Sequence, residues 1–199
     1  GTNNYSGATT VNAGTLAILK EGSLNTGAVG SWTAAKINVK SGAALALSVD
    51  TAGSAGFTVS NLNTLLANIS VANTAAEGLQ GGATLSLDTS TATAGTFTLS
   101  SAITNSTGAF GGVISLIKLG AGTLVLDQAN TYTGTTTISG GTIQYGDGGS
   151  LSTAPLALNG GTFDVNRSTT STQGTSFSTF ISGTGSLNNV GTGTLVLNA

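Results

Sequence analysis

Residues 118–143 read KLGAGTLVLDQANTYTGTTTISGGTI. In the segment TLVL within this stretch, strand alternation places Leu124 and Leu126 on one face, which we expect to point into the protein. Gly and Asn separate the short apolar runs, and both residue types tolerate the positive φ that sharp corners require. The stretch therefore predicts short β-strands joined by tight turns.

Both halves of this stretch recur elsewhere in the chain. Residues 3–16, NNYSGATTVNAGTL, align without a gap with residues 130–143, and seven of the fourteen pairs are identical. Residues 191–197, GTGTLVL, repeat residues 120–126, GAGTLVL, with one substitution. A tandem element of this kind indicates a repeat architecture.

The motif is complete at residues 118–143 and is split between residues 1–16 and 190–199. Joining Ala199 to Gly1 regenerates it with one extra residue. A solenoid coil cannot bury its apolar face alone. We therefore expect the chain to be one unit of a longer tandem array, or to stack end to end with copies of itself. The alternative is an arbitrary boundary that falls inside a repeat.

Such stacking would pair residues 1–16 of one copy with residues 190–199 of the next. The backbone donors and acceptors of an uncapped terminal coil make its edge adhesive. The residues predicted at this end-to-end interface are Tyr5, Thr9, Val11, Leu16, Thr194, Leu195 and Leu197.

The block at residues 118–143 resembles the passenger-associated repeat, also called the autotransporter-associated β-strand repeat. That pattern runs Lys-x-Gly-x-Gly-Thr-Leu-x-Leu, a spacer, Asn-x-Tyr-x-Gly, then Thr-Thr-Val/Ile and Gly-Thr-Leu, and the block follows it with Ile143 as its final residue. The resemblance implies a right-handed parallel β-helix, or β-solenoid, in a large secreted or cell-surface bacterial protein. It implies no catalytic residues.

The residues themselves predict an all-β chain that forms a single solenoid segment over residues 1–199. Short apolar runs mark the strands, for example at residues 45–47, 85–87 and 156–158. With roughly 20 to 25 residues per coil, taken from the repeat period, we expect about eight to ten coils.

One segment departs from this pattern. Residues 60–69 have apolar side chains at helical spacing, and Ser60 is placed as the N-cap. The spacing predicts a short helical insertion that covers apolar surface beside the coils. A latch or a contact for a partner is the alternative interpretation.

Composition excludes several kinds of chemistry. The 199 residues include no Cys and no His, which removes thiolate nucleophiles, imidazole bases and thiol or imidazole zinc sites. Five basic residues and a net charge of −2 do not suit nucleic-acid binding. No apolar run approaches the ~20 residues of a membrane-spanning helix. We predict no cofactor, no metal site and no membrane insertion by this segment.

These patterns together predict a structural segment of a fibre, stalk or adhesin rather than an enzyme, with copies of itself as the main partner and host or surface glycans as further partners. The alternative is a carbohydrate-binding or carbohydrate-cleaving β-helix, which needs clustered carboxylates or a nearby Arg. Asp164 and Arg167, with Asp147 one coil earlier, are the candidates, although a solvated surface pair is the simpler interpretation. A toxin or immune-evasion passenger is a third hypothesis.

Overall fold

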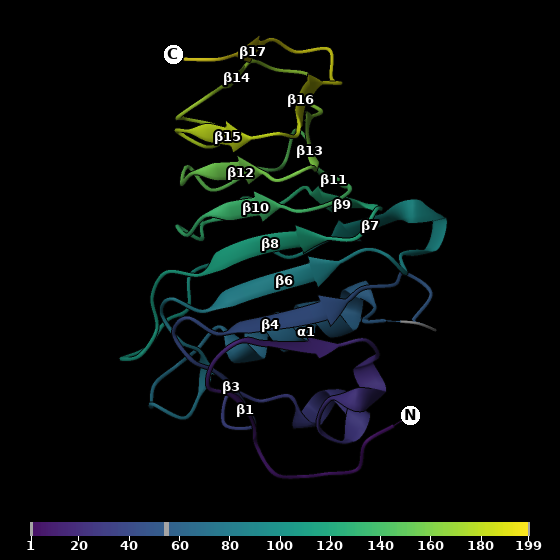
Figure 1. The fold of residues 1–199 in the computed structure, drawn as a ribbon, viewed down its shortest axis with the longest axis vertical. Coiled ribbons are helices and arrows are strands. Elements are labelled where there is room, and N and C mark those ends of the chain that lie inside the picture. Colours follow the sequence, from purple (N-terminus) through teal and green to yellow (C-terminus); the bar gives the residue numbers. More distant parts are fainter. Residues whose placement is uncertain (1, 54–55, 199) are drawn as a thin grey trace.

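The computed structural model describes residues 2–53 and 56–198, which wind into coils stacked along one long axis (Figure 1). One strand from each coil contributes to a seven-stranded parallel sheet, here called the first sheet. In spatial order its strands are β2 (Thr15–Ile18), β4 (Ala44–Ser48), β6 (Thr84–Asp88), β8 (Ser115–Leu119), β10 (Thr136–Ile138), β12 (Leu156–Leu158) and β15 (Ile181–Gly183).

A second sheet of five parallel strands stands beside the first. Its strands are β7 (Thr96–Leu99), β9 (Thr123–Leu126), β11 (Thr142–Tyr145), β13 (Thr162–Val165) and β16 (Ser186–Asn189). The third side consists of short strands on the path that leads back to the first sheet: β1 (Thr9–Val11), β3 (Ile37–Val39) and β5 (Gly78–Leu79), and, at the other end, β14 (Ser171–Thr172) and β17 (Leu195–Val196). All pairings between these described strands are parallel.

Rows of apolar side chains along the axis form the core. In the first sheet Leu45 pairs with Leu85, and Leu85 with Leu116, and all three side chains are fully buried. The next position in this row is Thr136, followed by Leu156. Because the register repeats from coil to coil, buried side chains of neighbouring coils lie over one another, which removes apolar surface from water along the stack.

The coils differ in length along the chain, as the paired residues of the first sheet show. At the N-terminal end Ala44 pairs with Thr84, whereas in the C-terminal half Leu116 pairs with Thr136 and Thr136 with Leu156. The coil between Ala44 and Thr84 is therefore twice as long as the coil between Leu116 and Thr136. Because the described residues contribute only seven strands to the first sheet, the prediction of eight to ten coils is wrong. The single period that it assumed fits only the C-terminal half.

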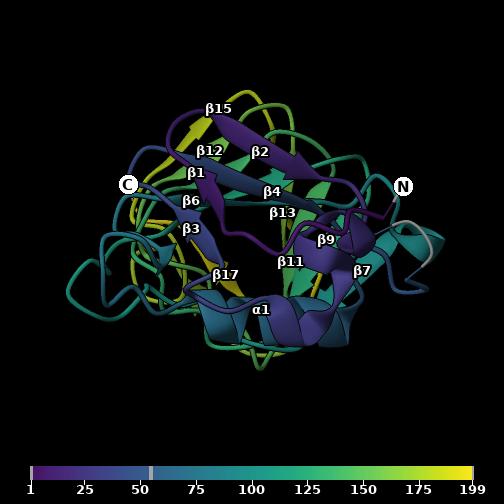
Figure 2. The ribbon, with the colours of Figure 1, turned by 90° about the horizontal axis from the view of Figure 1, so that it is seen from below.

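Helical insertions account for much of the longer N-terminal coils. The helix α1 (Val59–Ile69) lies on the side of the stack away from the first sheet (Figure 2). Within the described residues, four short 3-10 helices add to these coils: Glu21–Ser23, Asn25–Gly27, Val29–Ser31 and Thr93–Gly95.

The predicted helical insertion is confirmed, with a different cap. The apolar residues Leu62, Leu65, Leu66 and Ile69 are buried. The N-cap is Thr58, whose Oγ1 accepts a hydrogen bond from the backbone N–H of Asn61 at 3.2 Å. The assignment of Ser60 was wrong because the helix begins at Val59, which places Ser60 inside the first turn.

The mainly β, parallel arrangement agrees with the predicted β-solenoid. Its handedness remains a prediction.

Candidate functional site: the two ends of the stack

The strands at the two ends of the molecule have a sheet neighbour on one side only. At the N-terminal end these are β1 and β2, and at the C-terminal end β15, β16 and β17 (Figure 1). The outer edge of such a strand presents backbone groups that can pair with a further strand. These ends contain both groups of residues that the sequence predicts at an interface.

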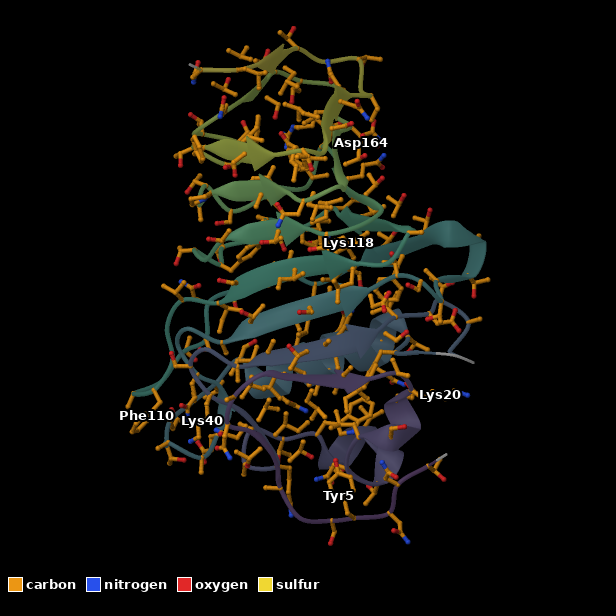
Figure 3. All side chains as sticks on the ribbon, viewed as in Figure 1. Tyr5, Lys20, Lys40, Phe110, Lys118 and Asp164 are labelled. Atoms are coloured by element: carbon orange, nitrogen blue, oxygen red, sulfur yellow. The ribbon has the colours of Figure 1, made fainter. Side chains whose placement is uncertain are left out.

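At the N-terminal end, Tyr5 is 38% exposed and its hydroxyl lies 2.6 Å from the Oγ1 of Thr9. Val11 is buried in the core, and Leu16 packs partly buried against it. Figure 3 shows Tyr5 at the lower end of the stack.

At the C-terminal end, Leu197 is 55% exposed, Thr194 is exposed and Leu195 packs partly buried against the core. The fold thus places the two groups of residues at opposite ends and does not bring them together within one chain. Contact between the groups in neighbouring copies remains a prediction.

The complete repeat inside the stack provides the reference geometry. Tyr132 corresponds to Tyr5 but is only 1% exposed. Its hydroxyl lies 2.6 Å from the Oγ1 of Thr136, which occupies the core row of the first sheet. Burial raises the pKa of Tyr132 well above its ordinary value, with hydrogen bonds from Thr136 and Ser152 opposing the shift. The pair thus places a satisfied hydroxyl in an apolar row.

The repeat lysine is also in the core. Lys118 continues the buried row of Leu87 and Ile138 and has no exposed surface. Its Nζ donates hydrogen bonds to the carbonyl oxygens of Leu119 (2.8 Å), Gly120 (2.8 Å) and Gly140 (3.1 Å), and so closes the corner between the two sheets. Burial lowers the pKa of Lys118 to about 8, and Asp88 opposes this shift. This position was not predicted, although the alternation of Lys118 with Leu116 is a signal that could have placed it on the inward face.

Gly120 makes this corner possible. Its φ is +79°, in the left-handed region that favours glycine. A Cβ here would also collide with the side chains of Asp88 and Ser90. Glycine is therefore the residue that fits this corner, where the three carbonyl oxygens converge on Lys118.

The candidate carbohydrate residues have other contacts. Asp164 Oδ1 accepts a hydrogen bond from the side chain of Asn188 at 2.9 Å. Asp147 accepts hydrogen bonds from the backbone N–H (2.7 Å) and the Oγ of Ser168, and these bonds lower its pKa. Within the described residues, no group of three or more acidic side chains is close enough to hold a metal ion. The carbohydrate hypothesis remains a prediction.

Arg167 secures a turn of the neighbouring coil. Its Nη1 donates to the carbonyl oxygens of Gly146 (3.3 Å) and Gly149 (2.7 Å), and its guanidinium lies 5.5 Å from the centre of the Tyr145 ring. Tyr145 stacks on Phe163 at 5.4 Å between ring centroids and contributes its hydroxyl to a hydrogen bond with Ser171. Burial raises the pKa of Tyr145 to about 12, against the opposing charge of Arg167.

A comparison with protein-family models matches residues 1–18 and 116–144 to the passenger-associated-transport-repeat. The chain carries this repeat. The matched segments are the complete motif and the half repeat at the N-terminal end of the chain, whereas the half repeat at residues 190–199 lies outside the matched residues. This repeat family implies a secreted or surface-exposed bacterial protein. No curated protein and no solved structure matches the chain.

No helix among the described residues is long and apolar enough to cross a membrane.

Proposed function

We propose that this passenger-associated repeat chain is a non-catalytic, right-handed β-solenoid segment of a secreted or surface fibre, stalk or adhesin, and that it stacks end to end with like units. The mechanism is mechanical. Parallel pairing continues through seven strands of the first sheet, so backbone hydrogen bonds run along the axis of the rod. Buried rows of Leu run in the same direction and resist bending and shear.

One observation carries the stacking part of the proposal. The outermost strands at each end have an unpaired edge, and those same strands hold the two halves of a repeat that is complete inside the stack. Adding strands to such edges is β-augmentation, in which main-chain hydrogen bonds supply affinity and side chains supply specificity. Copies of the chain thus offer each other the two halves of one motif.

Deletion of residues 190–199 tests the proposal. We expect purified wild-type chains to associate into filaments visible by electron microscopy, and the deletion to abolish them because it removes β17 and its free edge. Circular dichroism reports whether the shortened chain keeps its β structure. Filaments that persist unchanged after the deletion contradict the proposal, as does a wild-type chain that stays monomeric at every concentration.

A matched pair of single substitutions tests the same association without shortening the chain. Leu197→Lys places a charge on a residue that is 55% exposed at the C-terminal end, and should weaken association. Phe110→Lys does the same to a residue that is 46% exposed on a loop at the side of the stack (Figure 3), and should leave association unchanged.

A further inference from the structure

The similarity of the C-terminal half repeat to the complete repeat begins before residue 191. Residues 186–197, SLNNVGTGTLVL, align with residues 115–126, SLIKLGAGTLVL, and eight of the twelve pairs are identical. The strands β16 and β17 therefore correspond to β8 and β9 of the complete repeat. Leu197 is 55% exposed, whereas its counterpart Leu126 is 1% exposed. The difference arises because β10 and β11 cover β8 and β9 inside the stack, while β16 and β17 are edge strands.

The N-terminal half repeat is already folded as the complete repeat is folded. The Nδ2 of Asn130 donates to the carbonyl oxygen of Ser150, 20 residues later, at 2.8 Å. The Nδ2 of Asn3 donates to Ser23, also 20 residues later, at 2.9 Å. The tyrosine–threonine bond is likewise 2.6 Å long in both copies. Contacts toward the following coil are thus reproduced.

Contacts toward the preceding coil differ between the two copies. The Oδ1 of Asn130 accepts a hydrogen bond from the N–H of Ile103 at 2.8 Å, and Asn3 makes no corresponding bond within the part of the chain that the structure describes. The side of the N-terminal half repeat that corresponds to this contact has the fold of the complete repeat, but no coil of the described chain packs on it.

Two glycines support the same conclusion. A Cβ on Gly134 would collide with the carbonyl oxygen of Ile114 in the preceding coil, whereas one on the corresponding Gly7 would meet nothing within 4 Å. Gly141 lies against the carbonyl oxygens of Gly120 and Gly122 and has φ +61°. Its counterpart Gly14 has φ +68° and faces open space. The N-terminal end thus keeps the clearance that a preceding coil would need.

We infer that β1 and β2 of one copy stack on β16 and β17 of another in the register of the complete repeat; this inference rests on the proposed end-to-end stacking. Inside the chain, Thr136, Thr137 and Ile138 of β10 pair with Leu116, Ile117 and Lys118 of β8. The joint register is therefore Thr9 with Leu187, Thr10 with Asn188 and Val11 with Asn189. In the same way Leu16 pairs with Leu195, as Ile143 pairs with Leu124.

The joint also fits a covalent array. Leu116 and its partner Thr136 are 20 positions apart. In copies joined from Ala199 to Gly1, Leu187 and the next Thr9 are 21 positions apart, because 12 positions remain after Leu187 and Thr9 is the ninth residue. The coil across the joint is therefore one residue longer than the coil between Leu116 and Thr136, and one additional residue in a corner accommodates this difference.

This register turns each unit about the axis relative to the one before. The internal pairs β8–β9 and β10–β11 occupy the first and second sheets, but β16–β17 occupies the second sheet and the third side. The pair β1–β2 occupies the third side and the first sheet. Stacking β1 on β16 and β2 on β17 therefore rotates the next unit by one side of the solenoid, about a third of a turn.

Cysteine pairs distinguish this joint from an unrotated one, since the chain has no cysteine of its own. Two copies joined from Ala199 to Gly1 carry Asn188→Cys in the first copy and Thr10→Cys in the second. Both residues are exposed, and directly paired strand residues about 4.8 Å apart can form a disulfide. We expect nearly complete cross-linking under mild oxidation, measured as a mobility shift on a non-reducing gel.

The matched control carries Ser182→Cys in the first copy and Ala17→Cys in the second, both also exposed. An unrotated stack places β2 on β15, because Leu16 and Ile181 occupy the same row of the first sheet. Cross-linking of this control pair instead of the first pair overturns the rotated register and leaves end-to-end stacking intact. If neither pair cross-links and free copies stay monomeric, the proposed function fails as well.

Free chains provide an independent readout through Gly7→Ala. The alanine meets open space in one chain, so its thermal unfolding should be unchanged, but in the joint it faces the strand that corresponds to β8. We expect at least a tenfold loss of association by light scattering. Gly30→Ala, also in open space and exposed, is the matched control and should associate normally. Equal association of both variants contradicts the register.

Discussion

At the scale of single residues, the repeat lysine is a corner brace rather than a surface charge. Lys118 is completely buried, and its Nζ bonds to three carbonyl oxygens, two in its own coil and that of Gly140 in the next. Ammonium groups have three donors, so this arrangement uses all of them. The cost of burying the charge is visible in the lowered pKa of about 8.

Lys118→Met should lower the free energy of unfolding at pH 7 by about 2 kcal/mol, because it leaves buried carbonyl oxygens without donors. It should also remove a pH dependence. Between pH 8 and the ordinary lysine pKa of 10.5, the unfolded chain keeps a proton that folded Lys118 has released, so the wild type gains stability as pH rises. Urea unfolding at pH 8 and pH 10 measures both effects.

Lys20→Met is the control for this experiment, because Lys20 is exposed. It should leave the stability gain between pH 8 and pH 10 in place. A gain of equal size in Lys118→Met would show that another group is responsible. Above pH 10 the buried Tyr145, with its pKa raised to about 12, acts in the opposite direction, so the comparison ends there.

At the scale of secondary-structure elements, α1 fills the wide end of the stack. Four of its apolar residues are buried, and Trp32 and Phe57 lie beside one another in the same core, with ring centroids 5.3 Å apart. The Nδ2 of Asn68 donates to the carbonyl oxygen of Trp32 at 2.8 Å and ties the helix to the preceding segment. The helix is a packed part of the core, as its spacing predicted.

Thr58→Ala should lower the free energy of unfolding by about 1 kcal/mol, since it removes the N-cap acceptor of α1. Ser60→Ala is the matched control, because Ser60 is exposed inside the first turn and should change stability by a few tenths at most. Thermal unfolding of the two variants, followed by circular dichroism, makes the comparison. A larger effect at Ser60 would contradict the observed cap.

Alternation of apolar residues located many strands, including β4, β6 and β12, because Leu-x-Leu places two side chains on one face. It did not locate β8, where a charged Lys118 stands in an inward position. Contacts between coils decide that a charge can be buried there, and the local sequence does not contain them. Similarly, one period could not predict the long coil between Ala44 and Thr84, whose length depends on how α1 packs.

For the candidate site, sequence repetition located both ends and the residues on them. It did not reveal that the two halves occupy different sides of the solenoid from the complete repeat. That offset depends on where the intervening coils turn. The insertions in these coils lie outside the repeat motif, so the motif does not predict it. The sequence showed that Tyr5 and Tyr132 occupy equivalent positions in the repeat. It did not show that each hydroxyl forms a hydrogen bond with the threonine four residues later.

At the scale of the whole molecule, stability is distributed along one axis. Each strand in the interior of a sheet has a neighbour above and below, while β15, β16 and β17 have one. In such a quasi-one-dimensional fold, local opening is easiest where a coil has a single neighbour. The C-terminal coils are also more exposed than those that contain α1.

Hydrogen exchange should therefore show amides of β16 exchanging at least tenfold faster than those of β11 in the single chain. In two copies joined end to end, β16 of the first copy should become protected while β16 of the second stays fast. Mass spectrometry of peptides from both strands measures this. Equal protection of the two strands in the single chain would argue against a stack that opens from its end.

The unequal coils give the molecule a taper, since the longest coil lies near one end and the shortest lie toward the other (Figure 1). A filament of such units would have a sawtooth silhouette instead of a smooth one. Every step from a narrow end to the next broad end would point in the same direction along the filament axis. The direction of the chain could therefore be read from the outline alone. The broad ends would also place the side loops at regular intervals along the filament.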